Sequence, residues 1–220
     1  PSNPTGATLN AAEAHALVEL CSAQGIRLIV DEAYTDFKFN GDHQALPTDV
    51  DANLSTMVRV RSASKSWALC GWRLGWIAAD APLAARVAHT HSSLLNPASG
   101  PAQAALCALP EVSAKYRETA RSTVEGRMDE LCSALAREGL PINKPEGGFY
   151  LWFNVKDLSP TGTTNAADWC VKVARRSGVG LWPGDDFGSV GYVRISVTAP
   201  SEAKWRPAVE ALTEVITKIR

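Results

Sequence analysis

The sequence VRSASKSW, residues 60–67, is followed after three residues by GWRLGW, residues 71–76. Apolar residues precede the first stretch and follow the second, a pattern typical of two buried strands. Between the strands we expect a loop of small hydroxyl residues that carries Lys65, eight residues before Arg73. Taken alone, this segment favours an ordinary solvated lysine, because lysine side chains are rarely buried. The interpretation of Lys65 therefore depends on the segments that accompany it.

Three further segments change that interpretation. The sequence DEAYTDF, residues 31–37, ends an earlier apolar run, NPTG, residues 3–6, lies near the start, and YVRIS, residues 192–196, comes late. In order and spacing they resemble the active-site segments of the fold-type I pyridoxal-phosphate enzymes, specifically the class I and II aminotransferases. The resemblance extends over nearly all 220 residues but corresponds only to the later part of such an enzyme.

The resemblance implies an α/β fold in two parts. We expect residues 1–110 to be the C-terminal part of an aminotransferase-type, three-layer α/β large domain that binds the cofactor. Residues 111–220 are expected to form a smaller α/β C-terminal domain. Helix and strand patterns alternate along the chain, which is typical of α/β architecture. Because Pro1 opens the chain inside a motif, we expect a fragment or one half of a split enzyme that lacks the N-terminal third.

Composition limits the classes of partner. A net charge of −1 gives no electrostatic basis for binding nucleic acid or an anionic membrane surface. No apolar run reaches the length of about 20 residues that a membrane span needs. Five scattered cysteines without a C-x-x-C pair argue against a disulfide framework and favour a reducing cytoplasm. His89 and His91 are two residues apart on an expected helix, so they do not share a face, and no metal site is expected.

The first helix is expected over residues 11–24, with Thr8 or Asn10 as its N-cap. The apolar run at residues 26–30 then predicts a buried parallel strand. Asp31 follows at the carboxyl end of that strand, where ligands bind in open α/β sheets. A buried carboxylate needs a partner. That partner is either the backbone of the next segment, which Asp31 would cap, or a bound cofactor.

Further elements follow from periodicity. We expect a surface loop at 42–53, helices at 82–92, 102–109, 111–138, 166–177 and 201–219, and strands at 74–79, 149–153, 179–182 and 192–198. In the last strand Arg194 alternates with the apolar positions and so projects away from the apolar face. A solvated edge-strand arginine is the ordinary alternative.

By resemblance, the catalytic residues are Lys65, Asp31 and Tyr34, and Lys65 forms an imine with the aldehyde of pyridoxal 5'-phosphate. Asp31 pairs with the ring nitrogen of the cofactor, and Tyr34 reaches its phenolic oxygen. Ser62 and Arg73 match the phosphate ligands of the family. A lowered pKa would suit such a lysine, and the residues that make it plausible are Arg61, Arg73, Trp67, Trp72 and Trp76.

By resemblance, Asn3 donates to the phenolic oxygen of the cofactor and lies near the substrate carboxylate. Arg194 binds that carboxylate, a task that suits the two parallel hydrogen bonds of a guanidinium. The implied reaction moves an amino group between an amino acid and a 2-oxo acid. β-Lyases and cyclases share these residues, and a non-catalytic fragment is a third possibility.

The resemblance also implies partners. We expect a cytoplasmic homodimer, or association with a chain that supplies the missing N-terminal part, and no nucleic acid or membrane partner. Without that part we expect the 220 residues to bind the cofactor weakly. The identity of the substrate stays open: Trp182 and Tyr192 hint at a bulky apolar pocket, although aromatic residues at such positions are more often packing.

Overall fold

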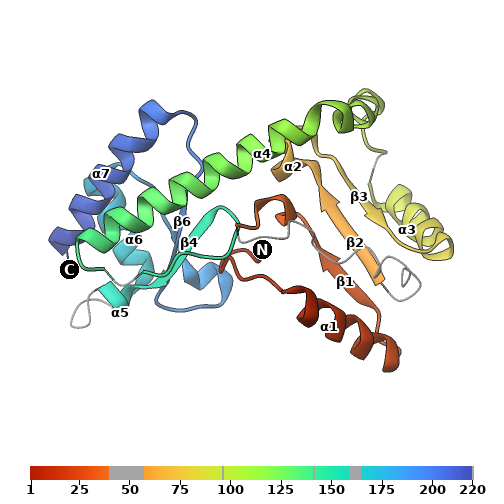
Figure 1. The fold of residues 1–220 in the computed structure, drawn as a ribbon, viewed down its shortest axis with the longest axis horizontal. Helices are drawn as coiled ribbons and strands as arrows, with labels where there is room; N and C mark the ends of the chain where they lie inside the picture. The colour runs from red at the N-terminus through yellow and green to blue at the C-terminus, as the bar shows by residue number, and fades with distance from the viewer. Residues whose placement is uncertain (40–56, 96, 141, 159–164, 220) are drawn as a thin grey trace. The chain divides into compact units, whose positions relative to one another are not determined.

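The computed structural model describes residues 1–39, 57–95, 97–140, 142–158 and 165–219, so the expected loop at 42–53 lies outside the described residues. The chain divides into two compact units, Thr8–Arg121 on the one hand and Pro1–Ala7 with Ser122–Arg220 on the other. Each unit contains a three-stranded sheet and helices (Figure 1). The α/β class expected from the sequence is thereby confirmed.

Helix α4 (Gly100–Arg137) differs from expectation. It is one helix of 38 residues, whereas the sequence predicted two helices with a break near residue 110. The compact units divide within this helix, between Arg121 and Ser122, and not between residues 110 and 111. The seven N-terminal residues belong with the C-terminal unit. The assignment of residues 1–110 to a cofactor-binding domain stays a prediction.

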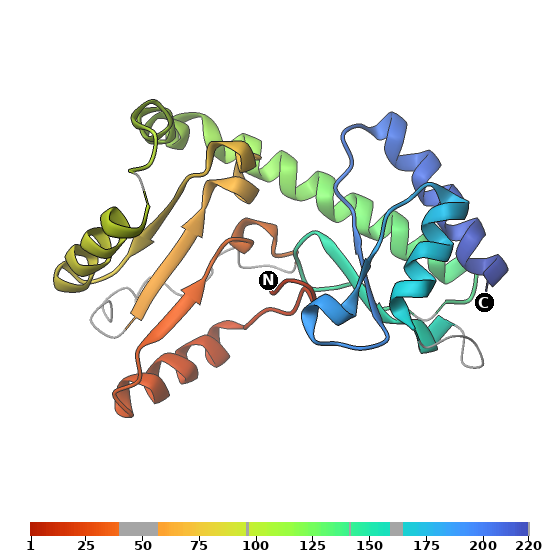
Figure 2. The same ribbon diagram turned by 180° about the vertical axis from the view of Figure 1, so that it is seen from behind.

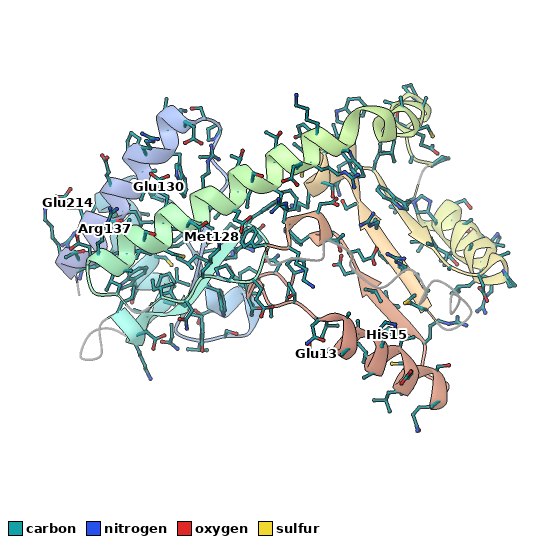
Figure 3. The ribbon with its side chains drawn as sticks, viewed as in Figure 1. Glu13, His15, Met128, Glu130, Arg137 and Glu214 are labelled. Atoms are coloured by element: carbon teal, nitrogen blue, oxygen red, sulfur yellow. The ribbon has the colours of Figure 1, made fainter. Side chains whose placement is uncertain are left out.

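The unit Thr8–Arg121 begins with helix α1 (Ala11–Ala23). Asn10 caps it, since its Oδ1 accepts from the Glu13 backbone N–H at 3.0 Å while Glu13 Oε2 accepts from the Asn10 N–H at 2.9 Å. Figure 3 shows Glu13 near the start of this helix. This reciprocal arrangement satisfies two backbone donors at the helix start. One face of α1 packs on the sheet, with Ala14 and Val18 buried against Met57.

The sheet of this unit has the order β1-β2-β3 (Figure 2). Strand β1 (Leu28–Asp31) is parallel to β2 (Met57–Ser62), and β2 is antiparallel to β3 (Gly75–Ala78). The parallel pairing confirms the expected strand, but its burial was predicted wrongly, because Ile29 is 69% exposed. Strand residues alternate between faces, and only the face of Leu28 packs on α1.

The β2–β3 pair requires a glycine at its closest approach. Gly75 pairs with Ser62, and a Cβ at Gly75 would lie 2.7 Å from the carbonyl oxygen of Arg61. After β3, helix α3 (Ala81–Leu94) is capped by Asp80, whose side chain accepts from the Leu83 N–H at 2.9 Å. The predicted helix at 82–92 is therefore confirmed.

The C-terminal unit contains the sheet order β4-β6-β5. Strand β6 (Tyr192–Ser196) is antiparallel to both β4 (Tyr150–Asn154) and β5 (Trp182–Pro183). Helix α6 (Ala166–Ser177) contacts β5 and β6 and packs on helix α7 (Glu202–Ile219). The core of this unit is formed by fully buried apolar side chains: Met128, Leu131, Leu135, Leu151, Val173, Val193, Ile195 and Ile216.

Polar contacts hold α7 on the C-terminal part of α4. Trp205 Nε1 donates to Glu130 at 2.6 Å, and Arg127 binds Glu202 through Nη2 at 2.7 Å. Among the helices of the described residues, none combines the length and the apolar character that a membrane crossing requires.

The N-terminal turn packs on the C-terminal unit. Gly6 has a φ of +72°, and a Cβ at this position would lie 2.5 Å from Pro145 Cβ and 2.6 Å from the Gly147 carbonyl oxygen. Only glycine satisfies both the left-handed conformation and this close approach. The turn therefore holds Asn3, four residues before the end of the N-terminal segment at Ala7, on the unit that carries β6.

Candidate active site

Lys65 lies in a short helix, α2 (Ala63–Ser66), that begins directly after β2. The loop predicted for this segment was wrong, because Ser62 caps the turn by accepting from the Ser64 N–H at 3.2 Å. The Lys65 side chain is partly buried, and its Nζ lies 5.7 Å from the centre of the Tyr34 ring. The structure therefore brings together two of the three residues expected to be catalytic.

Asp31 and Ser62 share one face of the sheet. Asp31 is paired with Val60 across the parallel strands, and Ser62 follows two residues later on the same strand as Val60. Asp31 is exposed, and its Oδ1 accepts from the Ala33 backbone N–H at 2.9 Å. Asp31 thus bonds to the backbone of the next segment, although the N-cap of the following 3₁₀ turn, η1 (Thr35–Phe37), is Tyr34, and the buried position expected for Asp31 was wrong.

The buried carboxylate at this strand end belongs to Glu32, which the sequence analysis missed. Glu32 is 3% exposed, and its Oε1 accepts from Arg59 Nε at 2.9 Å. Its Oε2 lies 3.2 Å from Arg61 Nε, close enough for an ion pair but not aligned as a hydrogen bond. Arg59 and Arg61 are two residues apart on β2, so both side chains lie on the face opposite Ser62. The alternation of the two arginines is visible in the sequence, but it does not identify Glu32 as their partner, because that pairing depends on strand register.

This ion pair involves one of the residues expected near Lys65. Arg61 faces Glu32, on the face of β2 opposite Ser62, and its effect on Lys65 stays a prediction. Of the three tryptophans expected near Lys65, Trp67 and Trp76 pack with ring centres 5.6 Å apart, whereas Trp72 is 49% exposed. The guanidinium of Arg117 lies 5.7 Å from the Trp67 ring.

Arg73 occupies an unusual backbone conformation. It is exposed, ends a 3₁₀ turn (η3, Cys70–Trp72) and has a φ of +55°. Its Nη1 donates to the Cys70 carbonyl oxygen at 3.1 Å. Ala68 has a φ of +53°, so two non-glycine residues with positive φ flank this turn. Such residues are uncommon and occur preferentially at ligand sites.

Arg194 is joined to Asn3. The Arg194 Nη1 donates to Asn3 Oδ1 at 2.8 Å, so the amide oxygen of Asn3 faces the guanidinium and its nitrogen can donate elsewhere. Both residues belong to the C-terminal unit. The projection of Arg194 away from the apolar face is confirmed, because its neighbours Val193 and Ile195 are buried while Arg194 is only partly buried.

Aromatic rings surround the guanidinium of Arg194, a feature that the sequence analysis did not find. The distances from Arg194 Cζ to the ring centres are 4.2 Å for Tyr150, 4.6 Å for Phe187 and 5.6 Å for Trp182. These residues come from β4, the 3₁₀ turn η4 (Gly184–Phe187) and β5. Strand pairing places Trp182 directly beside Arg194, which sequence periodicity alone does not specify.

The predicted site residues thus form two groups, one in each compact unit. The unit Thr8–Arg121 carries Asp31, Tyr34, Ser62, Lys65 and Arg73, and the other unit carries Asn3 and Arg194. The first group offers an amine, a carboxylate, two hydroxyls and a guanidinium at one end of the sheet. The amine fits an aldehyde, the carboxylate fits a protonated ring nitrogen, and the hydroxyls and guanidinium fit a phosphate, which are groups of pyridoxal 5'-phosphate.

Comparison with known proteins identifies the family of the chain. The sequence profile of the family described as aminotransferase class I and II matches residues 1–212. The chain is 31% identical over 205 residues to arginine–pyruvate transaminase AruH of Pseudomonas aeruginosa, covering 92% of this chain and 51% of that protein. It is 31% identical over 219 residues to aspartate/prephenate aminotransferase of Thermus thermophilus, covering 98% and 54% respectively.

The fold is also similar to solved structures. The structure of aspartate aminotransferase from Thermus thermophilus with maleate matches with a TM-score of 0.85 and 28% identity. That match covers 98% of this chain and 55% of the other. The chain spans about half the length of the relatives it matches.

Proposed function

Because this chain belongs to the class I and II aminotransferases, we propose that it moves an amino group between an amino acid and a 2-oxo acid with pyridoxal 5'-phosphate as cofactor. The observation that carries this proposal is the position of Lys65 at the end of β2, with its Nζ 5.7 Å from the Tyr34 ring. An amine held beside a phenol at a strand end can act both as a nucleophile and as a proton carrier.

Residues of the unit Thr8–Arg121 would hold the cofactor. Asp31 would keep a proton on the ring nitrogen through a charge-assisted hydrogen bond, and Tyr34 would donate to the phenolic oxygen. The Ser62 hydroxyl can still donate to phosphate while its oxygen accepts from Ser64, and Arg73 has N–H groups beyond the one bound to Cys70. When bound, pyridoxal phosphate supplies an aldehyde that bonds to amines and a ring that withdraws electrons from the α-carbon.

Lys65 would do the proton chemistry. As a free amine it takes the proton from the α-carbon of the amino acid and later returns one, a task for a general base held within reach. Return of the proton by Lys65 to the α-carbon would only regenerate the amino acid, whereas delivery to the cofactor carbon would allow transfer of the amino group. A lyase or cyclase would use the same lysine but would release a different product.

Arg194 and Asn3 would bind the substrate. The guanidinium offers donors other than the Nη1 group bound to Asn3, and a carboxylate accepts two parallel hydrogen bonds from such a fork. Asn3 fixes the orientation of the guanidinium from one side.

The expectation of a homodimer, or of a complex with a chain that supplies the N-terminal part, stays a prediction. The same holds for a cytoplasmic location. The cytoplasmic location is supported by the five cysteines, all of which are free thiols in the structure.

Isotope transfer tests the proposal. The protein is incubated with pyridoxal phosphate, a panel of ¹⁵N-labelled amino acids and unlabelled 2-oxo acids, and new amino acids are analysed by mass spectrometry. We expect the label in a new amino acid with the wild-type chain and not with Lys65→Ala. Release of labelled ammonia or a cyclic product would indicate the alternative chemistry, and transfer equal to that of Lys65→Ala would refute the proposal.

A further inference from the structure

The rings around Arg194 differ in how much of each is open to solvent. Trp182 is 51% exposed, whereas Tyr150 is only partly exposed and lies against the guanidinium at 4.2 Å. Trp182 stands directly beside Arg194 in the β5–β6 pairing, and its ring centre is 5.6 Å from the guanidinium carbon. A large apolar surface therefore remains uncovered next to the positive charge.

The other aromatic residues near Arg194 pack on one another. Trp152 stacks on Tyr192 at 5.1 Å with an interplanar angle of 16°, and it meets the edge of Phe187 at 5.7 Å. Tyr192 is thus packing, one of the two roles that the sequence left open. Trp182 is the half-exposed ring of this group that borders Arg194.

We propose that Trp182 is the specificity-determining residue of the carboxylate site and that it selects amino and 2-oxo acids with aromatic side chains. This inference rests on the proposed function, in which Arg194 binds the substrate carboxylate. A carboxylate on Arg194 places the rest of the substrate beside the exposed indole. An aromatic side chain buries its apolar surface there and gains the favourable geometry of a ring pair.

Charge disfavours substrates with acidic or basic side chains at this position. A second carboxylate, as in a dicarboxylic acid, would be desolvated against the indole after Arg194 is already neutralised by the first. A cationic side chain is attracted by an indole face, but here it would meet the like charge of Arg194 beside the same ring.

Substitution of Trp182 tests the inference. We compare kcat/KM for phenylalanine, aspartate and arginine in the wild-type chain, in Trp182→Ala and in Trp182→Phe. The wild type should prefer phenylalanine, Trp182→Ala should lower that preference about tenfold, and Trp182→Phe should restore most of it. Tyr116→Ala is the matched control, because Tyr116 is a similarly exposed ring (44%) on the other compact unit.

A binding measurement keeps the two proposals separable. Hydrocinnamate and succinate are titrated into the chain without cofactor. The contribution of Trp182 to the fluorescence is obtained by subtracting the signal of the Trp182→Phe variant from that of the wild type. Quenching by hydrocinnamate at concentrations about tenfold below succinate is the expected result. Equal quenching by both, or an unchanged phenylalanine preference in Trp182→Ala, overturns the inference. Absence of transfer from all three donors refutes the proposed function alone.

Discussion

Arg194 Nη1 donates to Asn3 Oδ1 at 2.8 Å and so joins two residues 191 positions apart in the chain. The N-terminal turn and the last strand of the C-terminal unit thereby share one polar contact. Rings of Tyr150 and Phe187 lie against the same guanidinium at 4.2 and 4.6 Å. These contacts restrict the orientation of Arg194 before any ligand arrives, which reduces the entropy cost of binding a carboxylate.

The first prediction concerns that guanidinium. Arg194→Lys keeps the positive charge but loses the planar fork, so we expect kcat/KM to fall about 10–100-fold, mainly through KM. Steady-state kinetics with the preferred donor measure this. Arg206→Lys on the exposed side of α7 is the control and should leave both constants unchanged. An Arg194→Lys enzyme with a wild-type KM would show that the substrate carboxylate binds elsewhere.

Glu32 provides a test of stability. Glu32→Gln removes the charge that faces Arg59 and Arg61 while the side chain keeps its size. Breaking a buried ion pair from one side leaves uncompensated charge, so we expect the free energy of unfolding to fall by about 3–5 kcal/mol. Urea denaturation followed by circular dichroism measures it.

The control for Glu32 is an exposed acid in an ion pair. Glu118 pairs with Arg121 at 2.5 Å, and its side chain is 58% exposed. Glu118→Gln should change the free energy of unfolding by no more than about 1 kcal/mol. Equal losses for both variants would mean that the Glu32 cluster adds nothing beyond a surface pair.

The candidate site was expected in part because the segments that resemble the family's active-site segments are each short and local in the sequence. The spacing of Lys65 and Arg73, and the strand that ends at Asp31, are local features. Glu32 was missed because its partners lie on β2, 27 positions away for Arg59. Likewise, the rings beside Arg194 come from three different elements, and strand register brings them together. Long-range pairing of this kind is not contained in a periodic pattern.

The fold was predicted well where caps and periodicity agreed. Helix α6 has the expected bounds because Asn165 caps it, and Gly178 ends it with a φ of +72°. The break expected near residue 110 did not occur, because the residues on both sides of that position favour a helix and form one continuous helix. The exposure of Ile29 could not be foreseen, since burial depends on which other elements cover a face.

Gly75 and Gly126 should respond oppositely to alanine. A Cβ at Gly75 meets the Arg61 carbonyl oxygen at 2.7 Å, so Gly75→Ala should destabilise the chain by about 1–3 kcal/mol. Gly126 lies in α4, and a Cβ added there meets no atom of a described neighbour within 4 Å, so Gly126→Ala should stabilise the chain by about 0.5–1 kcal/mol. Thermal unfolding of both variants measures the difference. A stable Gly75→Ala chain would show that the β2–β3 pair can separate without cost.

Cysteine alkylation should depend on pH in a site-specific way. Burial, reinforced by Asp185, raises the pKa of the Cys170 thiol to about 11. Burial and Asp129, opposed by Lys144, likewise raise the pKa of the Cys132 thiol to about 11. The thiolate is the reactive form, so both residues should resist iodoacetamide at pH 8 and gain about tenfold in rate per pH unit up to that pKa.

The exposed thiols are the internal control. Cys70 and Cys107 are open to solvent and should be alkylated first at pH 8. Peptide mapping by mass spectrometry assigns each rate. Cys170 reacting as fast as Cys70 at pH 8 would contradict the buried position of Cys170.

The most direct test of the central claim is covalent trapping on Lys65. The chain is mixed with excess pyridoxal phosphate and reduced with borohydride, and the labelled peptide is identified by mass spectrometry. Reduction captures even a weakly held cofactor, so tight binding by the 220 residues is not required. We predict that the pyridoxyl group is found preferentially on Lys65 and that Lys65→Arg loses this label. A label spread over the surface lysines, with no preference for Lys65, would contradict the account.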